Sequence, residues 1–283
     1  MKVSVVIPAK NESATVAAVV DAVRESHPDF EVIVVDDGST DKTAQLARDS
    51  GAKVVAHPYS KGNGAAIKSG TRAATGDVIV FMDADGQHDP ADIQRLLDRI
   101  DEGFDLVVGA RQQGSQASVG RGLANGFYNR LATYMTGHKV EDLTSGFRAV
   151  CADKFREFLY LLPNGFSYPT TSTMAFFRAG YSVVYEPIHA SQRIGKSHIK
   201  PLKDGVRFLL IIFKIGTLYS PLKLFAPVSV LAFFVATLWY GYTLVMEGRF
   251  TNMSALLYTG SVMVFLMGLI SEQITALMYK ESR

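Results

Sequence analysis

The first 198 residues predict an α/β sandwich with a mostly parallel sheet, and two observations carry this prediction. Short, almost entirely apolar runs alternate with longer segments in which apolar residues recur at helical spacing. Strands that are apolar on both faces are typical of parallel sheets covered by helices on each side. Right-handed crossovers between such strands then produce a nucleotide-binding sandwich.

The elements follow one another in a regular order. Strands are expected at five places: 3–8, 31–37, 52–57, 77–84 and 105–111. Helical patterns fill the four intervals between them: 11–26, 38–50, 61–74 and 90–103. Asp89 is expected to cap the fourth helix, with Pro90 at its first position.

The composition changes after residue 223. Residues 224–246 contain no charge, and a second apolar run covers about 253–275. Each run is long enough to cross roughly 30 Å of hydrocarbon as a helix. The sequence therefore predicts three parts, namely a domain at 1–198, a juxtamembrane segment at 199–223 and a transmembrane hairpin at 224–279.

Basic residues set the expected orientation of the hairpin. Those flanking its two ends outnumber the single Arg249 in the connecting loop: Lys200, Lys203, Arg207, Lys214, Lys223, Lys280 and Arg283. Positive residues stay inside, so the domain and both termini are expected on the cytoplasmic side of the cell membrane. Cationic residues precede and follow the apolar run 208–213. This pattern predicts an amphipathic helix lying at the membrane interface.

Polar side chains gather where the predicted strands end. Asp83, Asp85 and Gln87 stand at spacing two, directly after an apolar strand, and Asp36 and Asp37 follow another. In open α/β sheets this edge is where ligands bind. Carboxylates that face a nucleotide can hold ribose hydroxyls and base N–H groups, whereas carboxylates that face a diphosphate need a divalent cation between them.

Several classes of protein are disfavoured. The formal net charge is only +2, which gives no argument for nucleic acid as a partner. The first strand is followed by "PAKNES" instead of a glycine fingerprint, and Gly62 and Gly64 after the third strand are weak evidence for phosphate binding. The single cysteine, Cys151, excludes an internal disulfide and a cysteine-rich zinc site.

Five motifs in register resemble a known family. "VVIPAKNE", "VVDDGSTD" and "MDADGQHDP" on successive strand ends resemble inverting GT-A glycosyltransferases of family 2. "DLTSGFRAV" and "RIGKSHIKPLKDG" are similar to the polyprenyl-phosphate branch, which includes the dolichol-phosphate mannose and glucose synthases and bacterial relatives. The resemblance implies transfer of a hexose from GDP-mannose, UDP-glucose or UDP-GlcNAc to the phosphate of a polyprenyl lipid, with Mg²⁺ or Mn²⁺. A homo-oligomer is compatible with it.

The resemblance also implies roles for individual residues. Those matching contacts to the donor nucleotide are Pro8, Lys10, Glu12, Asp37, Asp83 and Ala84. Asp85 and Gln87 match the metal ligands, with Asp85 also counted as catalytic and as a donor contact. The acceptor side is matched by Arg111, Arg121, Asp142 and Ser145, and Arg193 and Lys196 match basic residues of a loop over the phosphates.

The chemistry of a lipid phosphate acceptor fits these residues. A phosphomonoester has its second pKa near 6, so it is largely a dianion at neutral pH and needs no general base. It needs cations, and arginine forks suit phosphate; Arg111, Arg121, Arg148 and Arg193 are the candidates. For Arg148 the alternative is a structural salt bridge with Asp142 or Glu141. Asp142 either orients the acceptor or acts as a covalent nucleophile.

The histidines divide into two groups. His27, His57 and His138 sit at element ends, where surface or capping roles are expected. His88 and His198 adjoin the acidic motif and the basic loop, so contact with phosphate is considered for both.

Competing functions fit the sequence less well. A processive polysaccharide synthase would add a Gln-x-x-Arg-Trp motif, but the only tryptophan, Trp239, lies inside the first apolar run. A nucleotidyltransferase would carry a glycine-rich motif after its first strand, where none stands. The sequence is also compatible with a non-catalytic membrane subunit that presents lipid to a partner enzyme, and with a family 2 enzyme that uses another acceptor.

Overall fold

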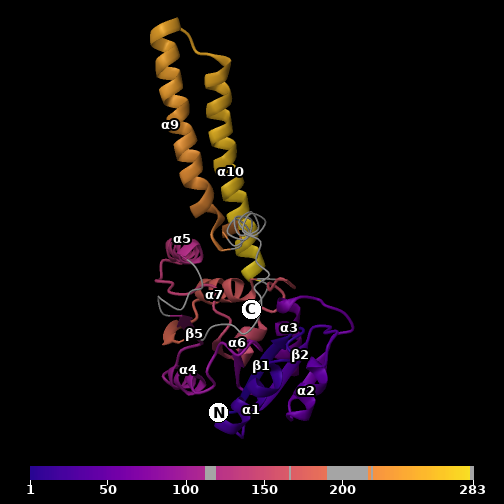
Figure 1. The fold of residues 1–283 in the computed structure, drawn as a ribbon. Helices are drawn as coiled ribbons and strands as arrows, with labels where there is room; N and C mark the ends of the chain where they lie inside the picture. The colour runs from indigo at the N-terminus through magenta and orange to yellow at the C-terminus, as the bar shows by residue number, and fades with distance from the viewer. Residues whose placement is uncertain (112–118, 166, 190–215, 218, 281–283) are drawn as a thin grey trace. The chain divides into compact units, whose positions relative to one another are not determined.

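The computed structural model describes residues 1–111, 119–165, 167–189, 216–217 and 219–280, with the backbone alone at 119–125 and 278–280 (Figure 1). The chain divides into two compact units, Met1–Lys200 and Pro201–Arg283. The predicted boundary at residue 198 and the predicted interfacial helix at 208–213 lie outside the described residues.

The first unit is built on a seven-stranded sheet in the order β3-β2-β1-β4-β6-β5-β7. Its strands are β1 (Val3–Ala9), β2 (Glu31–Asp36), β3 (Lys53–Ala56), β4 (Val78–Phe81), β5 (Leu106–Arg111), β6 (Arg148–Cys151) and β7 (Val183–Ile188). Neighbouring strands run parallel except that β6 is antiparallel to both β4 and β5. The mostly parallel sheet predicted from the sequence is confirmed.

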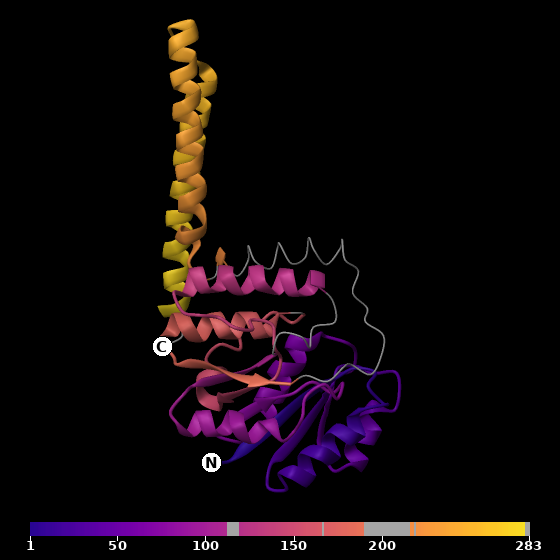
Figure 2. The same cartoon turned by 60° about the vertical axis from the view of Figure 1, so that its left-hand side comes forward.

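Helices cover both faces of this sheet, as the doubly apolar strands require (Figure 2). One face carries α1 (Val16–Ser26), α2 (Thr43–Asp49) and α4 (Asp92–Asp101). The other carries α3 (Asn63–Ala73), α6 (Ala152–Arg156) and α7 (Tyr168–Ala179). A further helix, α5 (Val119–Thr136), contacts α7.

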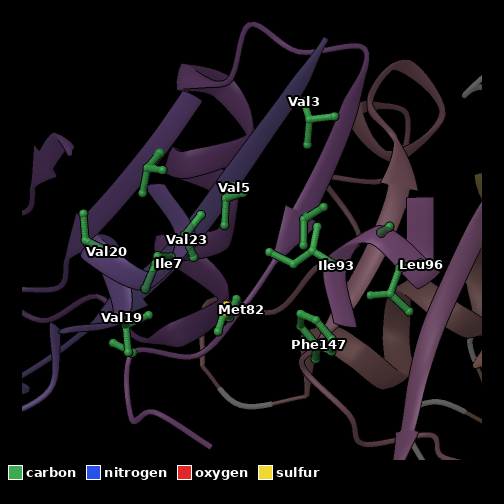
Figure 3. Close-up of a cluster of buried hydrophobic side chains, with 14 of the residues drawn as sticks. Val3, Val5, Ile7, Val19, Val20, Val23, Met82, Ile93, Leu96 and Phe147 are labelled. Atoms are coloured by element: carbon green, nitrogen blue, oxygen red, sulfur yellow. The ribbon is translucent and has the colours of Figure 1, made fainter. Parts of the chain in front are cut away.

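Successive strand residues enter different cores. Val5, Ile7 and Met82 belong to the cluster under α1 and α4, together with Val19 and Ile93 (Figure 3). Their neighbours along the strands point the other way. The ring of Phe81, for example, packs 4.9 Å from that of Phe155 and 5.9 Å from that of Tyr168.

Several elements differ from the sequence prediction. The strands β6 and β7 and the helices α5, α6 and α7 were not predicted. For β6 the reason is that it is short and begins with a buried arginine, Arg148. The helix α4 begins at Asp92, two residues after the predicted start. The prediction that Asp89 caps this helix was wrong, because the N-cap is Ala91 and no side chain caps the helix. Asp89 Oδ1 accepts a hydrogen bond from the backbone N–H of Ala91 at 2.9 Å, in the turn before the helix.

The second unit is a hairpin of α9 (Pro221–Glu247) and α10 (Asn252–Lys280), both long and apolar enough to cross a membrane. The first helix begins three residues before the predicted 224. Large apolar side chains point outward, and Leu238 and Val245 are 75 % and 82 % exposed. Between the helices, Ser229 Oγ donates to the carbonyl of Ser261 at 2.9 Å. The hairpin thus buries Ser229, Thr243, Ser254, Ser261 and Thr275 and exposes many of its large apolar side chains.

Candidate active site

The carboxyl ends of four strands meet at one edge of the sheet. Backbone hydrogen bonds join them. The N–H of Asp37 donates to the carbonyl of Ala9 at 2.9 Å, that of His57 to the carbonyl of Asp36 at 2.9 Å, and that of Met82 to the carbonyl of Val6 at 3.2 Å. The polar residues that follow these strands therefore lie side by side, as the sequence predicts for a parallel sheet.

The acidic turn, residues 83–87, follows β4. Asp85 is buried, and its Oδ1 accepts a hydrogen bond from the N–H of Gln87 at 3.2 Å across Gly86, whose φ is +71°. Glycine adopts this left-handed backbone without strain. Asp83 is more open, with 38 % of its side chain exposed. The turn thus brings one buried and one exposed carboxylate to the sheet edge.

This donor set fits a hard divalent cation. Carboxylate and amide oxygens are the ligands that Mg²⁺ prefers, and Mg²⁺ typically takes one or two protein carboxylates and completes its shell with substrate phosphates. Within the described residues no group of three or more His, Cys, Asp or Glu side chains could form a closed metal site. Asp85 and Gln87 are therefore suited to share a cation with a bound diphosphate.

His88 packs between the acidic turn and Phe147. Its side chain is 5 % exposed and stacks on the ring of Phe147 at 4.8 Å, with Nε2 3.8 Å from Asp83 Oδ2. Among the described residues Nδ1 has no hydrogen-bond partner. The stacked, buried position is that of a packing residue beside Asp83, so the considered contact of His88 with phosphate has no support here.

Asp37 is the centre of a buried network after β2. One oxygen accepts hydrogen bonds from His57 Nδ1 at 2.8 Å and Lys61 N–H at 2.7 Å, and the other from Ser60 Oγ at 2.7 Å and Gly62 N–H at 2.9 Å. The far nitrogen of His57 lies 2.9 Å from Ser69 Oγ. The expectation of a surface or capping role for His57 was wrong, because the ring is buried and ties Asp37 to α3.

These hydrogen bonds decide the ionisation of Asp37. Burial alone would raise the pKa of this carboxyl, but the donors from His57, Ser60, Lys61 and Gly62 outweigh it and lower the pKa to about 2. Since the folded-state pKa lies below the ordinary 3.8, the charged form contributes stability above about pH 4. That contribution is lost as the pH falls through about 2.

Asp37→Asn is therefore expected to lower the free energy of unfolding by about 1–2 kcal/mol at neutral pH, because one strong set of charge-assisted hydrogen bonds is weakened. The difference from the wild type should shrink between pH 4 and pH 2. Thermal unfolding in detergent across that range measures it, with the exposed Asp21→Asn as control. A difference that stays constant down to pH 2 would contradict the assignment.

The other residues matched to donor contacts lie around Asp37. Lys10 is exposed, and its Nζ donates to Ser60 Oγ at 2.9 Å. Glu12 and Pro8 are partly exposed, whereas Ala84 is buried with its carbonyl accepting a hydrogen bond from Thr15 Oγ1 at 2.7 Å. The structure thus brings the predicted donor-side residues of β1, β2 and β4 to one edge.

Gly62 and Gly64 have a structural explanation. A Cβ on Gly64 would lie 1.9 Å from the carbonyl oxygen of Pro163, and one on Gly62 would lie 2.5 Å from that of Asn164. The first N–H groups of α3 donate to this loop, from Gly64 to Gly165 at 3.1 Å and from Ala65 to Asn164 at 2.9 Å. These two N–H groups are thus satisfied by backbone carbonyls and are not available to a phosphate.

Arg111 and Asp142 form a two-pronged ion pair at the end of β5. Arg111 Nε donates to Asp142 Oδ2 at 2.8 Å and Nη2 to Oδ1 at 3.0 Å, while Nη2 also donates to Thr144 Oγ1 at 2.7 Å. Burial alone would raise the pKa of Asp142, but the Arg111 guanidinium and backbone N–H groups outweigh it and hold this pKa below its usual range. The charge of Asp83 lies close enough to stabilise the charged form of Arg111.

The Asp142 loop, residues 142–147, is fixed by this pair. Asp142 Oδ1 also accepts hydrogen bonds from the N–H groups of Thr144 and Ser145, both at 3.1 Å. The side chain of Ser145 is buried and its hydroxyl faces the carbonyl of Phe147 at 3.5 Å. With both oxygens of Asp142 engaged, the carboxylate is built to position its neighbours and is poorly placed to attack a sugar.

Arg148 is neither a phosphate ligand nor a partner of Asp142 or Glu141, so both interpretations of it were wrong. It is fully buried and donates to neutral groups, namely the carbonyls of Ser145 and Pro169 and the hydroxyls of Ser172 and Thr173. Burial lowers the pKa of its guanidinium. Arg148 therefore holds the Asp142 loop against the first turn of α7.

Sequence and structure do not cover the same set of site residues. The side chain of Arg121 and the residues Arg193, Lys196 and His198 lie outside the described part of the chain. Other residues were missed by sequence reasoning, notably His57, Ser60, Thr144 and Tyr168. Tyr168 Oη donates to the carbonyl of Gly146 at 2.9 Å, and no local sequence signal points to such a long-range contact.

The fold and the site together define a GT-A glycosyltransferase, with a mostly parallel sheet that carries an acidic turn at the carboxyl end of β4. The chain belongs to glycosyl transferase family 2, whose family model matches residues 4–159. Residues 220–277 match a second model, the GtrB C-terminal hairpin.

Similar proteins support this assignment. The chain is 28 % identical to "Glycosyltransferase AglJ" of Haloferax volcanii, over 97 % of this chain and 94 % of that protein. It is 29 % identical to "Undecaprenyl-phosphate 4-deoxy-4-formamido-L-arabinose transferase" of Pectobacterium atrosepticum, over 96 % and 88 %.

Solved structures of glucosyl-3-phosphoglycerate synthase from Mycobacterium tuberculosis share the fold. A complex with phosphoglyceric acid superimposes with a TM-score of 0.59 at 26 % identity, covering 76 % of this chain and 79 % of that one. A second complex contains Mn²⁺, UDP and glucosyl-3-phosphoglycerate, with a TM-score of 0.57 and 26 % identity.

Proposed function

We propose that this protein is a membrane-bound inverting glycosyltransferase that moves a hexose from a nucleotide sugar to the phosphate of a polyprenyl lipid. The observation that carries the proposal is the combination, in one chain, of a family 2 sheet edge with an apolar hairpin whose outward side chains suit lipid. The relative named as an undecaprenyl-phosphate transferase spans both parts of the chain and supports the same acceptor class.

On the donor side, the residues of the sheet edge bind and orient the nucleotide sugar. Asp37 holds the loop at 60–62 through its hydrogen bonds, so the edge beside β2 is preformed. Asp85 and Gln87 are the residues that would hold Mg²⁺ or Mn²⁺ against the diphosphate. The bound cation supplies neutralisation of the charge that develops on the leaving nucleoside diphosphate.

On the acceptor side, the protein must stabilise the negative charge of the lipid phosphate. The lipid phosphomonoester is largely a dianion above about pH 6 and attacks without a general base. Among the residues that the structure describes, Arg111 is suited to bind that phosphate, because Asp142 keeps its guanidinium charged and oriented. Arg121 and Arg193 remain proposed to assist it, and Lys196 to cover the phosphates, from their positions in the family motifs.

Transfer of label into lipid tests the proposal. Membranes containing the protein are incubated with GDP-mannose, UDP-glucose or UDP-GlcNAc, each labelled in the sugar, and extracted with organic solvent. One of these labels is expected in the organic phase, in a product that mild acid releases as free sugar. Label that stays with water-soluble products for every donor, in membranes that hold folded protein, would contradict the proposed acceptor.

The proposed topology gives a second test. A cysteine in the exposed loop, Arg249→Cys, is expected to react with an impermeant maleimide in intact cells, because the loop at 247–252 is the part proposed to emerge on the non-cytoplasmic side of the membrane. The exposed Glu25→Cys on α1 should react only after lysis, with Cys151→Ser in both backgrounds. The reverse pattern would place the catalytic domain outside the cytosolic pool of nucleotide sugars.

A further inference from the structure

The loop between β3 and α3 carries an exposed aromatic ring. Tyr59 is 67 % exposed, and the one interaction described for its ring is with the ammonium of Lys61, 5.8 Å from the ring centre. A single exposed ring is ordinary on a protein surface and needs no partner by itself. This ring differs because its backbone is fixed against the donor side of the candidate site.

Asp37 and Gly38 hold the backbone on both sides of the ring. The N–H groups of Lys61 and Gly62 donate to the two oxygens of Asp37 at 2.7 Å and 2.9 Å. Tyr59 itself lies directly over Gly38, because a Cβ on that glycine would be 2.6 Å from the carbonyl carbon of Tyr59. The point from which the ring projects is therefore set by the turn that follows β2.

The order of the strands indicates which part of a nucleotide sugar lies beside Tyr59. In the sheet order β3-β2-β1-β4-β6-β5-β7, Asp37 follows β2, Asp85 follows β4, and Arg111 ends β5. Neighbouring strands are about 4.8 Å apart, so the ends of β2 and β4 are about 10 Å apart and the end of β3 lies about 5 Å further out. Because the sugar must face Arg111 on the acceptor side, a diphosphate held at Asp85 directs its base toward β2 and β3.

The charges around the ring suit a nucleotide better than an apolar partner. Lys10 and Lys61 are both exposed, and neither is paired with a carboxylate in the described part of the chain. Lys10 Nζ reaches the same loop and donates to Ser60 Oγ at 2.9 Å. Bases stack on aromatic side chains and phosphates attract ammonium groups, whereas an apolar protein surface would desolvate both ammonium groups without compensation.

We propose that Tyr59 determines donor specificity by stacking on the base of the nucleotide sugar, with the ammonium of Lys61 on the other face of its ring. The stack adds affinity for a nucleoside that Asp85 and its cation cannot supply, since they contact only the diphosphate. The site thereby distinguishes a nucleotide sugar from a diphosphate that carries no base. This inference rests on the donor class of the proposed function and is independent of the acceptor.

Calorimetric titration of the full chain in detergent, with Mn²⁺ present, tests this role. The probes are UDP, GDP and inorganic pyrophosphate, which has no base. Tyr59→Ala is expected to weaken the tighter-binding nucleotide by about tenfold, the size of one base–aromatic stack, and to change pyrophosphate binding by less than about twofold. Tyr59→Phe keeps the ring and should bind like the wild type. Tyr160→Ala, which removes a ring that is 56 % exposed elsewhere, is the matched control.

Fluorescence gives a readout of direct contact that a structural role of Tyr59 would not produce. The only tryptophan, Trp239, is replaced by Trp239→Phe, and an indole is then introduced by Tyr59→Trp. The nucleotide that binds more tightly is expected to quench this indole, because the base stacks on it, whereas pyrophosphate should leave its emission unchanged. The same indole introduced by Tyr160→Trp should respond to neither.

The outcomes separate this inference from the proposed function. Equal nucleotide affinity in the wild type and Tyr59→Ala, or an indole at position 59 that no nucleotide quenches, would overturn the stacking role. An equal loss of nucleotide and pyrophosphate binding would mean that the substitution disturbs the loop held by Asp37, and would also overturn it. Stacking observed in a protein that transfers no sugar to lipid would leave this role intact and overturn the proposed acceptor. A folded protein that binds neither nucleotide would overturn both.

Discussion

Asp85→Ala is expected to reduce sugar transfer by about 10²- to 10³-fold while the protein remains folded. A preorganised group that stabilises developing charge is worth roughly this much in kcat, and Asp85 is proposed to act through the cation that it holds. The buried carboxylate makes a turn contact with Gln87 and lies outside the main apolar clusters, so little packing is lost.

A matched control lies four residues away. Asp89 is exposed and its Oδ1 accepts one hydrogen bond from the N–H of Ala91, so Asp89→Ala should cost about 1 kcal/mol of stability and little activity. Binding of Mn²⁺ in the presence of UDP, followed by electron paramagnetic resonance, gives a readout besides activity. Unchanged Mn²⁺ affinity in Asp85→Ala would contradict its assignment as a ligand.

Asp142→Ala is expected to have the second large effect, on both stability and acceptor use. It leaves the guanidinium of Arg111 largely buried without its carboxylate and releases the N–H groups of Thr144 and Ser145. Removing one partner of a buried pair costs about 3–5 kcal/mol, and the 29 % exposure of the Arg111 side chain places the expected loss near 3 kcal/mol. The KM for the lipid acceptor should rise, while donor binding at the Asp37 edge should be preserved.

The neighbouring carboxylate provides the comparison. Glu141 is 40 % exposed and pairs with the open Lys139, so Glu141→Ala should change stability by less than about 1 kcal/mol. A double-mutant cycle between Arg111→Gln and Asp142→Asn measures the coupling itself. A coupling free energy near zero would mean that Asp142 does not position Arg111, the arginine proposed to bind the acceptor.

The residues of the sheet edge could be predicted from the sequence because each motif is recognised from its immediate neighbours along the chain. Each motif follows an apolar strand directly, and parallel strands bring their carboxyl ends to one edge. The order of the strands is therefore enough to place Asp37, Asp83, Asp85 and Gln87 together. The apolar hairpin was equally predictable, since its signal depends only on length and composition.

The supporting contacts could not be predicted in this way. Arg148 was considered as a phosphate ligand or a salt-bridge partner because the sequence shows that it is charged but does not show that it is buried. Its partners Ser172 and Thr173 lie 24 and 25 residues further along the chain. His57 likewise depends on Ser69 and on the turn after β2. The contacts of Arg148 depend on which face β6 presents once it has inserted antiparallel between β4 and β5. Those of His57 depend on how α3 packs beside the ends of β2 and β3.

The anomeric configuration of the lipid product tests the central claim most directly. If the lipid phosphate attacks the sugar itself while Asp142 stays bound to Arg111, an α-linked donor must yield a β-linked polyprenyl-phosphate sugar. Nuclear magnetic resonance of the purified product, prepared from the donor that labels the organic extract, should show the β-linkage alone. An α-linked product, or a sugar trapped covalently on Asp142, would contradict direct displacement by the lipid phosphate.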